Sequence, residues 1–215
     1  MQIENHKEEV PFSHYEGRFM QASPEEILGR LPEAKWDGKE FFLTLLGKHY
    51  AIGHPQYHIR EKQWADVGIG PYTGNESNQP NLPTQTFLLR YLLEAKSVPF
   101  RGSWLTFREM PWGELYIKPY TGRVLTRAAF TFGTRIEKFK AAAEKMGGLP
   151  VGHGDAGYQF DLIGGYAMRI LVWEGDDEFP PNAQVLYSDN FADGFAAEDR
   201  VVAGDILISA IKANM

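Results

Sequence analysis

Four carboxylates lie within five residues in the last third of the chain, on a turn framed by Trp173 and by Phe179-Pro180-Pro181: Glu174, Asp176, Asp177 and Glu178. Several oxygen ligands on a turn bent by a glycine are what a hard cation such as Ca²⁺ or Mg²⁺ requires. Crowded carboxylates also raise one another's pKa, which is how a general acid is made. The spacing does not match a calcium-binding loop. A solvated turn that prevents edge pairing of the neighbouring strands explains the same residues, so both interpretations stay open.

A second candidate is the segment 104–116, WLTFREMPWGELY, in which Arg108 and Glu109 sit between aromatic residues. An arginine beside aromatic rings can clamp a carboxylate or phosphate while the rings stack on a planar ligand. If the segment is a strand, alternation puts Arg108 and Glu109 on opposite faces, so only one of them points at a shared site. The alternative is a structural ion pair, with the acidic turn as one candidate partner.

The third candidate is a group of histidines, His49, His54 and His58. The spacing of His54 and His58 would place two metal ligands on one face of a helix, but Pro55 lies between them and the flanking residues favour strand or loop. A looser metal site, or axial ligation of a tetrapyrrole by one histidine, competes with the ordinary roles of isolated histidines on the surface or in hydrogen-bonded cores.

The fourth candidate is the glycine-rich segment 147–157, GGLPVGHGDAG, which contains His153 and Asp155. Backbone amides in such a loop can bind anions, and the two side chains can orient a proton transfer. The segment lacks the strand–helix context of a dinucleotide-binding fingerprint. A loop that leads from a helix into a strand explains most of its glycines. The sequence contains neither a Gly-x-Ser-x-Gly elbow nor a P-loop.

Composition limits the class of protein. The chain has 215 residues, 43% of them hydrophobic, which is enough for a full core. A net charge of −6 argues against nucleic acid as a partner, because that binding depends on Lys and Arg. The chain has no cysteine, which excludes disulfides, thiolate-bound zinc and its own iron–sulfur clusters. The charged N-terminus and the lack of a long apolar run predict a cytoplasmic protein with no membrane association.

Hydrophobic spacing and breaker residues predict an α+β fold with a mixed or antiparallel sheet and three to four packed helices. Residues 1–22 are expected to be an N-terminal extension and 23–215 a single compact domain. The sequence predicts helices over 23–31, 84–96, 134–146 and 197–212, with Ser23 as the N-cap of the first and Gly147-Gly148 ending the third. Strands are expected over 40–46, 49–52, 104–109, 115–117, 158–163, 166–173 and 183–188. The first two form a hairpin with Gly47-Lys48 as its turn, and residues 68–83 form a long exposed loop.

Several blocks in a fixed order resemble the uncharacterised domain family DUF3786, over roughly residues 24–212: Leu88-Leu89-Arg90-Tyr91-Leu92, Gly102-Ser103-Trp104-Leu105-Thr106-Phe107-Arg108-Glu109, Phe132-Gly133, Gly147-Gly148, Gly154-Asp155-Ala156, Trp173-Glu174-Gly175-Asp176-Asp177-Glu178-Phe179-Pro180 and Glu198-Asp199. The resemblance brings no established activity. It implies relatives in anaerobic bacteria and archaea, some with Cys-rich iron–sulfur segments or a link to corrinoid-dependent methyl transfer. Because this chain has no cysteine, a redox centre would have to belong to a partner. The histidine group is not part of the resemblance.

Two functions from different classes fit these features. The preferred one is a cofactor- or small-molecule-binding accessory protein of anaerobic metabolism, linked to a tetrapyrrole or corrinoid, which works with a small molecule or with a redox or cofactor protein. Its ligand-binding residues would be Trp104, Arg108, Glu109, Asp155, Trp173, Asp176 and Glu178. The alternative is a metal-assisted hydrolase or lyase that uses Asp176, Glu178, Asp155 and Asp189 as ligands of a divalent metal or as acid/base groups. If the acidic side chains splay into solvent and no pocket adjoins Trp104, a protein-interaction module is the better description.

Overall fold

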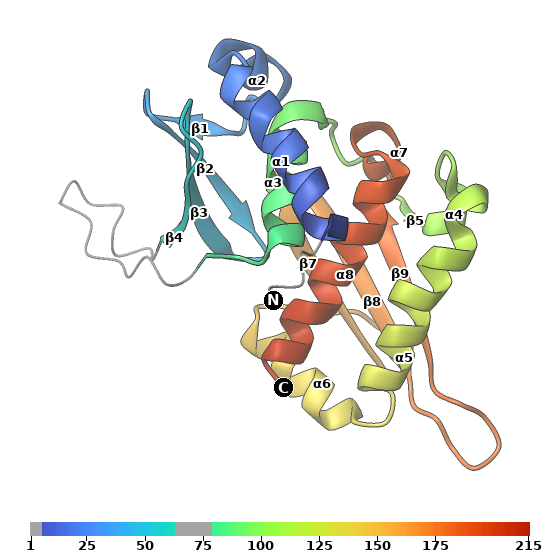
Figure 1. Ribbon diagram of the computed structural model, residues 1–215. Coiled ribbons are helices and arrows are strands. Elements are labelled where there is room, and N and C mark those ends of the chain that lie inside the picture. Colours follow the sequence, from blue (N-terminus) through green and yellow to red (C-terminus); the bar gives the residue numbers. More distant parts are fainter. Residues whose placement is uncertain (1–5, 63–78) are drawn as a thin grey trace. The chain divides into compact units, whose positions relative to one another are not determined.

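The chain forms two compact units. The computed structural model describes residues 6–62 and 79–215 (Figure 1). The first unit is Met1–Ser97 and the second is Val98–Met215. Both units contain helices and an antiparallel sheet, which confirms the expected α+β class. Helices are more numerous than the three or four expected, because residues 6–21 and 113–132 are also helical. The division into an extension and one domain from residue 23 stays a prediction.

In its described residues, the first unit combines helices with a four-stranded sheet in the order β1-β2-β3-β4. The helices are α1 (His6–Gln21), α2 (Pro24–Arg30) and α3 (Leu82–Glu94), and the strands are β1 (Lys35–Trp36), β2 (Glu40–Leu45), β3 (Lys48–Gly53) and β4 (Ile59–Lys62). Helix α1 packs against α3, and the core includes the fully buried side chains of Phe19, Phe41 and Leu89. Local capping explains two of the helix starts, because Ser23 and Asn81 each accept a hydrogen bond from a backbone N–H in the first turn.

The hairpin of β2 and β3 is confirmed, but its turn lies one residue earlier than expected. Leu45 pairs with Lys48, so the two turn residues are Leu46 and Gly47. Both have positive φ, 48° and 76°, which a two-residue hairpin turn of the primed type requires. The expected loop over 68–83 lies mostly outside the described residues, and its last two residues belong to α3.

The second unit is built on a five-stranded antiparallel sheet in the order β5-β9-β8-β7-β6. Its strands are β5 (Trp104–Thr106), β6 (Leu149–Pro150), β7 (Ala156–Ile163), β8 (Tyr166–Trp173) and β9 (Asn182–Ser188). Its helices are α4 (Gly113–Tyr120), a π-helical segment (Thr121–Thr126), α5 (Arg127–Phe132), α6 (Ile136–Lys145), α7 (Phe191–Gly194) and α8 (Ala197–Ala213). The strands expected over 158–163, 166–173 and 183–188 and the helices expected over 134–146 and 197–212 are confirmed.

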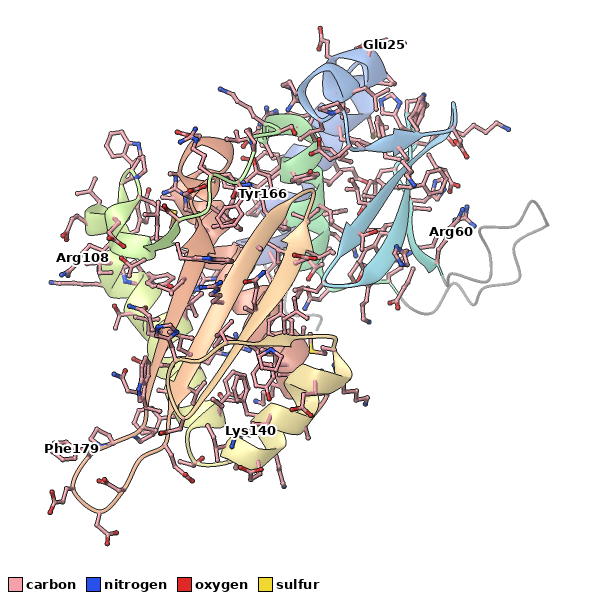
Figure 2. The ribbon with its side chains drawn as sticks, turned by 180° about the vertical axis from the view of Figure 1, so that it is seen from behind. Glu25, Arg60, Arg108, Lys140, Tyr166 and Phe179 are labelled. Carbon is pink, nitrogen blue, oxygen red and sulfur yellow. The ribbon has the colours of Figure 1, made fainter. Side chains whose placement is uncertain are left out.

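One face of this sheet carries the core of the second unit. Alternate residues of the three long strands are buried on this inner face, among them Phe160, Ile170 and Val185. Helices α5 and α6 and the π-helical segment contact the strands (Figure 1). Helix α8 packs against these three helical segments. Gly204 lets α8 approach the π-helical segment closely, because a Cβ at this position would lie 2.9 Å from a methyl group of Val124. Seen from the opposite, outer face, the strands lie in front of the helices of the second unit (Figure 2).

The prediction of strands over 104–109 and 115–117 is wrong after Thr106. The Glu109 carboxylate folds back and accepts hydrogen bonds from the backbone N–H and the hydroxyl of Thr106, at 2.7 and 2.8 Å. This capping box ends β5 and starts a single 3₁₀ turn, Phe107–Glu109. Helix α4 follows at Gly113, so Leu115 and Tyr116 are helical. Pro119 within the segment hides this helix from a reading of local propensity.

Candidate functional site

The acidic turn between β8 and β9 is closed by its own backbone. The Asp176 carboxylate accepts hydrogen bonds from the backbone N–H groups of Glu178 and Phe179, at 2.9 and 2.7 Å. These two bonds hold the pKa of Asp176 below its ordinary value of 3.8, which is the opposite of what a general acid needs. All four carboxylate residues are exposed, and Figure 2 shows Phe179 on the loop that extends beyond the end of the sheet. The turn therefore resembles a structural cap more than a cation site.

Asp155 is the one predicted site residue that meets this turn. Its carboxylate accepts a hydrogen bond from the backbone N–H of Glu174 at 2.8 Å, and its own N–H donates to the carbonyl of Val172 at 3.0 Å. The carboxylate therefore fastens the loop after β6 to the end of β8. Within residues 6–62 and 79–215, no three acidic or histidine side chains form a group that could hold a metal ion. The metal site that the hydrolase alternative requires is therefore absent from the described residues, because its four carboxylates do not come together: Asp155, Asp176, Glu178 and Asp189.

Trp104 and Trp173 lie at opposite ends of β9. Trp104 pairs with Ser188, the last residue of that strand, whereas Trp173 pairs with Asn182, the first. Six residues of strand separate these positions, which is roughly 20 Å. Arg108 is near the Trp104 end and forms an exposed ion pair with Glu114, 3.3 Å from Nε to Oε1 (Figure 2). The structure therefore does not bring Trp104, Arg108 and Glu109 together with Trp173 and the acidic turn around one pocket.

The three histidines of the predicted group, all in the first unit, do not converge either. His49 contacts the Thr44 hydroxyl through Nδ1 at 2.8 Å, near the hairpin turn. His54 follows the other end of β3, with its ring packed edge-on against Phe19 at 5.1 Å between centroids. His58 contacts Glu40 through Nε2 at 3.1 Å. Each side chain thus has a separate structural environment.

Glu40 is the centre of a buried charge cluster on the first sheet. Its carboxylate accepts hydrogen bonds from Nε and Nη2 of Arg60, at 3.1 and 2.8 Å, as well as the contact from His58. Burial raises the pKa of Glu40, but the hydrogen bonds from Arg60 and His58 outweigh it, so the pKa lies below its ordinary value of 4.5. The folded first unit therefore favours the ionised carboxylate.

The Glu40→Gln variant is expected to lose about 1–3 kcal/mol of stability at pH 7, the usual contribution of hydrogen bonds to a charged group. Because the folded-state pKa is lowered, this contribution is present above pH 4.5 and is lost as the pH falls through the folded-state value. Amide hydrogen exchange in β2 and β3 of the full chain, measured between pH 7 and pH 3, gives the difference between the two proteins. A difference that stays constant down to pH 3 would contradict the prediction. Glu61→Gln is the control, since the one ion pair of Glu61 with a described residue is that with the exposed Lys48.

Ser188, Asp189 and Asn190 form a buried polar junction at the end of β9. The two carboxylate oxygens of Asp189 accept hydrogen bonds from the backbone N–H groups of Arg101 and Ser103, at 3.0 and 2.9 Å. Burial raises the pKa of Asp189, but these bonds outweigh it and the net shift is downward. The Asn190 amide donates to the carbonyls of Val98 and Gly165. Both oxygens of Asp189, a candidate metal ligand from the sequence, are therefore used to hold the segment before β5.

Arg200, a residue to which the sequence gives no role, is the largest polar side chain buried in the second unit. It is 2% exposed and donates to three backbone carbonyls: Pro111 at 2.7 Å, Ala192 at 3.2 Å and Phe195 at 2.7 Å. Burial lowers its pKa. The guanidinium thereby fixes the turn before α4 to the segments on either side of α7. An arginine at the first turn of a helix gives no local signal of this role.

Helix α4 has apolar residues on two sides. Its inner stripe faces the core and consists of Gly113, Ile117, Tyr120 and, in the π-helical segment, Val124. Tyr120 stacks on Phe107 with 4.0 Å between ring centroids. Its outer stripe consists of Trp112, Leu115, Tyr116 and Pro119, spaced at i, i+3, i+4 and i+7. Trp112, Leu115 and Tyr116 are 68%, 72% and 45% exposed. A helix face of this kind normally lies against another element.

Trp112 has a left-handed backbone conformation, with φ 65° and ψ 0°. For a bulky residue this conformation costs roughly 1–2 kcal/mol, whereas glycine adopts it freely. The next residue is held tightly, because a Cβ on Gly113 would lie 2.1 Å from the carbonyl oxygen of Phe107. The turn therefore projects an indole ring outward at a cost to the folded state. The spacing of the outer stripe can be read from the sequence, but only the structure shows that its side chains are exposed to solvent.

Comparison with known proteins places the chain in one family. A family model described as a domain of unknown function, DUF3786, matches residues 23–210. The chain therefore belongs to the DUF3786 family, as the sequence motifs indicate. Searches of the curated proteins and of the solved structures give no match. Among the described residues, no helix combines the length and the apolar character needed to cross a membrane.

Proposed function

We propose that this protein is an interaction module that binds a partner protein through the outer stripe of α4. The observation that carries the proposal is Trp112, a large aromatic side chain that is 68% exposed on a left-handed backbone. The fold gains little packing energy from a side chain in that position. Strained residues that persist without a packing reason are typical of functional sites. Tryptophan and tyrosine are also the residues that most often dominate the binding energy of protein interfaces.

The partner is expected to present an apolar groove with an acidic rim. Anchors at i, i+3, i+4 and i+7 are how one helix docks into the groove of another protein. The segment 108–135 has five basic and two acidic residues, in a chain whose net charge is −6. Lys118 is exposed on α4, and Arg108 and Arg123 are exposed beside it although they form ion pairs with Glu114 and Asp205. The net positive charge of the segment favours an acidic rim and speeds association. Four stripe residues are few against the roughly 20–30 per side of a stable complex, which favours a transient partner over a permanent dimer.

The Trp112→Gly variant is expected to be as stable as the wild type or about 1 kcal/mol more stable, because glycine relieves the left-handed strain. The same variant is expected to bind the partner at least about tenfold more weakly, as loss of an interface anchor predicts. Photo-crosslinking from position 115 in the native host would identify the partner. Calorimetry with the two purified proteins would then give the affinity, and urea denaturation the stability.

Val10→Gly is the matched control for binding, because Val10 is a similarly exposed apolar residue on α1 of the first unit. The proposal fails if Trp112→Gly binds the purified partner as tightly as the wild type. It also fails if the stripe mediates pairing of two copies, seen as a dimer by light scattering that Trp112→Gly dissociates. Binding to anionic lipid vesicles that depends on Trp112 would likewise replace a protein partner with a membrane surface.

A further inference from the structure

The outer face of the second sheet, opposite the core, has an arginine at its centre. Strand register aligns five residues in one row across all five strands: Thr106, Leu186, Arg169, Gln159 and Leu149. Arg169 belongs to β8, the middle strand of the sheet. Figure 2 views the molecule from this side, with the strands in front of the helices. A charged residue at the centre of a sheet face, half-buried, needs partners for its donors.

Two contacts orient the guanidinium of Arg169. Nε donates to the side-chain oxygen of Gln159 at 3.1 Å. The central carbon lies 3.9 Å from the centroid of the Trp104 ring, a close cation–π contact. Gln159 is beside Arg169 on the next strand, whereas Trp104 reaches it from the edge strand β5. The plane and the direction of the guanidinium are therefore set before any ligand arrives.

The terminal amino groups of Arg169 remain available for a ligand. Among the described residues, the side chain makes one hydrogen bond, from Nε to Gln159, and no carboxylate forms an ion pair with it. An arginine whose Nε is already bonded presents its two terminal nitrogens as a fork that fits carboxylate or phosphate oxygens. An apolar side chain flanks the fork in the sheet, because the half-buried Leu186 lies beside Arg169 in its row. It gives contact area for the apolar part of a ligand.

We infer that this outer face is a binding site for a small organic anion, in which Arg169 binds the carboxylate or phosphate group and Trp104 and Gln159 hold the arginine in position. The site is separate from the outer stripe of α4 and does not depend on it. It places ligand recognition at Arg169 rather than at Arg108, whose guanidinium is paired with Glu114. The ring of Trp104, which was expected to stack on a planar ligand, instead stacks on the guanidinium of Arg169 from another strand.

Titration of the full chain with benzoate and with phenyl phosphate tests the site, with the arginine Nε–H signals followed by NMR. The Arg169 signal, assigned by its loss in Arg169→Lys, is expected to shift in a saturable way. Benzamide has nearly the same shape as benzoate without the charge, and it should not shift the signal. The probe that binds more tightly shows whether the natural ligand carries a carboxylate or a phosphate.

Arg169→Lys keeps the charge but removes the fork, so it should weaken binding of the preferred probe, measured by calorimetry, by about tenfold or more. Gln159→Leu frees Nε and should weaken binding severalfold. Arg101→Lys is the control, because Arg101 is an exposed arginine paired with Asp193, and binding should not change. The inference is overturned if neither anion gives a saturable shift, if benzamide shifts the signal equally, or if Arg169→Lys binds like the wild type.

Discussion

The Arg200→Met variant is expected to lose about 3 kcal/mol of stability, a large share of what a small domain has. Three backbone carbonyls, those of Pro111, Ala192 and Phe195, lose their donor in a site that is 2% exposed. Each buried acceptor left without a partner costs about 1–3 kcal/mol. Removal of a buried charge and the apolar packing of methionine offset part of this loss. The net effect remains strongly destabilising, because no other donor replaces a three-way connection.

Urea denaturation of the full chain, followed by the fluorescence of Trp104, Trp112 and Trp173 in the second unit, measures this loss. The stability of Arg200→Lys should lie between those of the wild type and of Arg200→Met, since one ammonium group cannot reach all three carbonyls with the same geometry. Arg123→Met is the matched control, because Arg123 is exposed and pairs with Asp205, and it should change stability by less than about 1 kcal/mol. If Arg200→Met is no less stable than Arg123→Met, the three carbonyls do not depend on this guanidinium.

The Gly113→Ala variant is expected to lose a similar amount, about 3 kcal/mol, through steric overlap and not through lost hydrogen bonds. The added methyl group would lie 2.1 Å from the carbonyl oxygen of Phe107 and 3.0 Å from the Cα of Arg108. Both are backbone atoms, so the whole turn has to move. The start of α4 would move with it, and Trp112 would change direction. Partner binding through the outer stripe should therefore fall together with stability.

The control is Gly122→Ala in the π-helical segment, where an added Cβ meets no atom within 4 Å. Alanine should be neutral or slightly stabilising there, by up to about 1 kcal/mol, because it reduces the entropy of the unfolded chain. Calorimetric unfolding of the two variants side by side makes the comparison. Equal melting temperatures would show that the turn before α4 yields easily and that Gly113 is not required for its shape.

Elements with local signals could be predicted from the sequence. Ser23 caps α2 with its own side chain, and Gly147, with φ 77°, ends α6 as its position indicates. The spacing of Thr106 and Glu109 is a local capping signal that the strand interpretation did not use. The turn that follows had no such signal, because its shape depends on Arg200, which holds Pro111 from far along the chain. Hydrophobic residues at 112, 115 and 116 fit a turn and a strand as readily as a helix, so spacing alone could not decide.

The candidate sites show the same limit. The aromatic and charged residues of 104–116 were found from the sequence, but their partners were not. Trp104 meets Arg169 only because β5, β9 and β8 are neighbours in the sheet. The outer stripe of α4 could be recognised only when the inner stripe was seen to fill the core. The acidic turn was the strongest signal in the sequence, yet Asp176 binds backbone N–H groups within the turn itself.

The π-helical segment Thr121–Thr126 holds one extra residue without changing the direction in which α4 displays its outer stripe. A π-turn contains one residue more than an α-turn, so deletion of one residue here would leave an α-turn and keep nearly the same rotation of α4 relative to α5. In a regular α-helix one residue corresponds to about 100° of rotation around the axis, so the same deletion inside α4 would turn part of the inner stripe outward. This short segment is therefore the place where the chain tolerates a change of length. A relative one residue shorter in this segment would display the same stripe to the same partner.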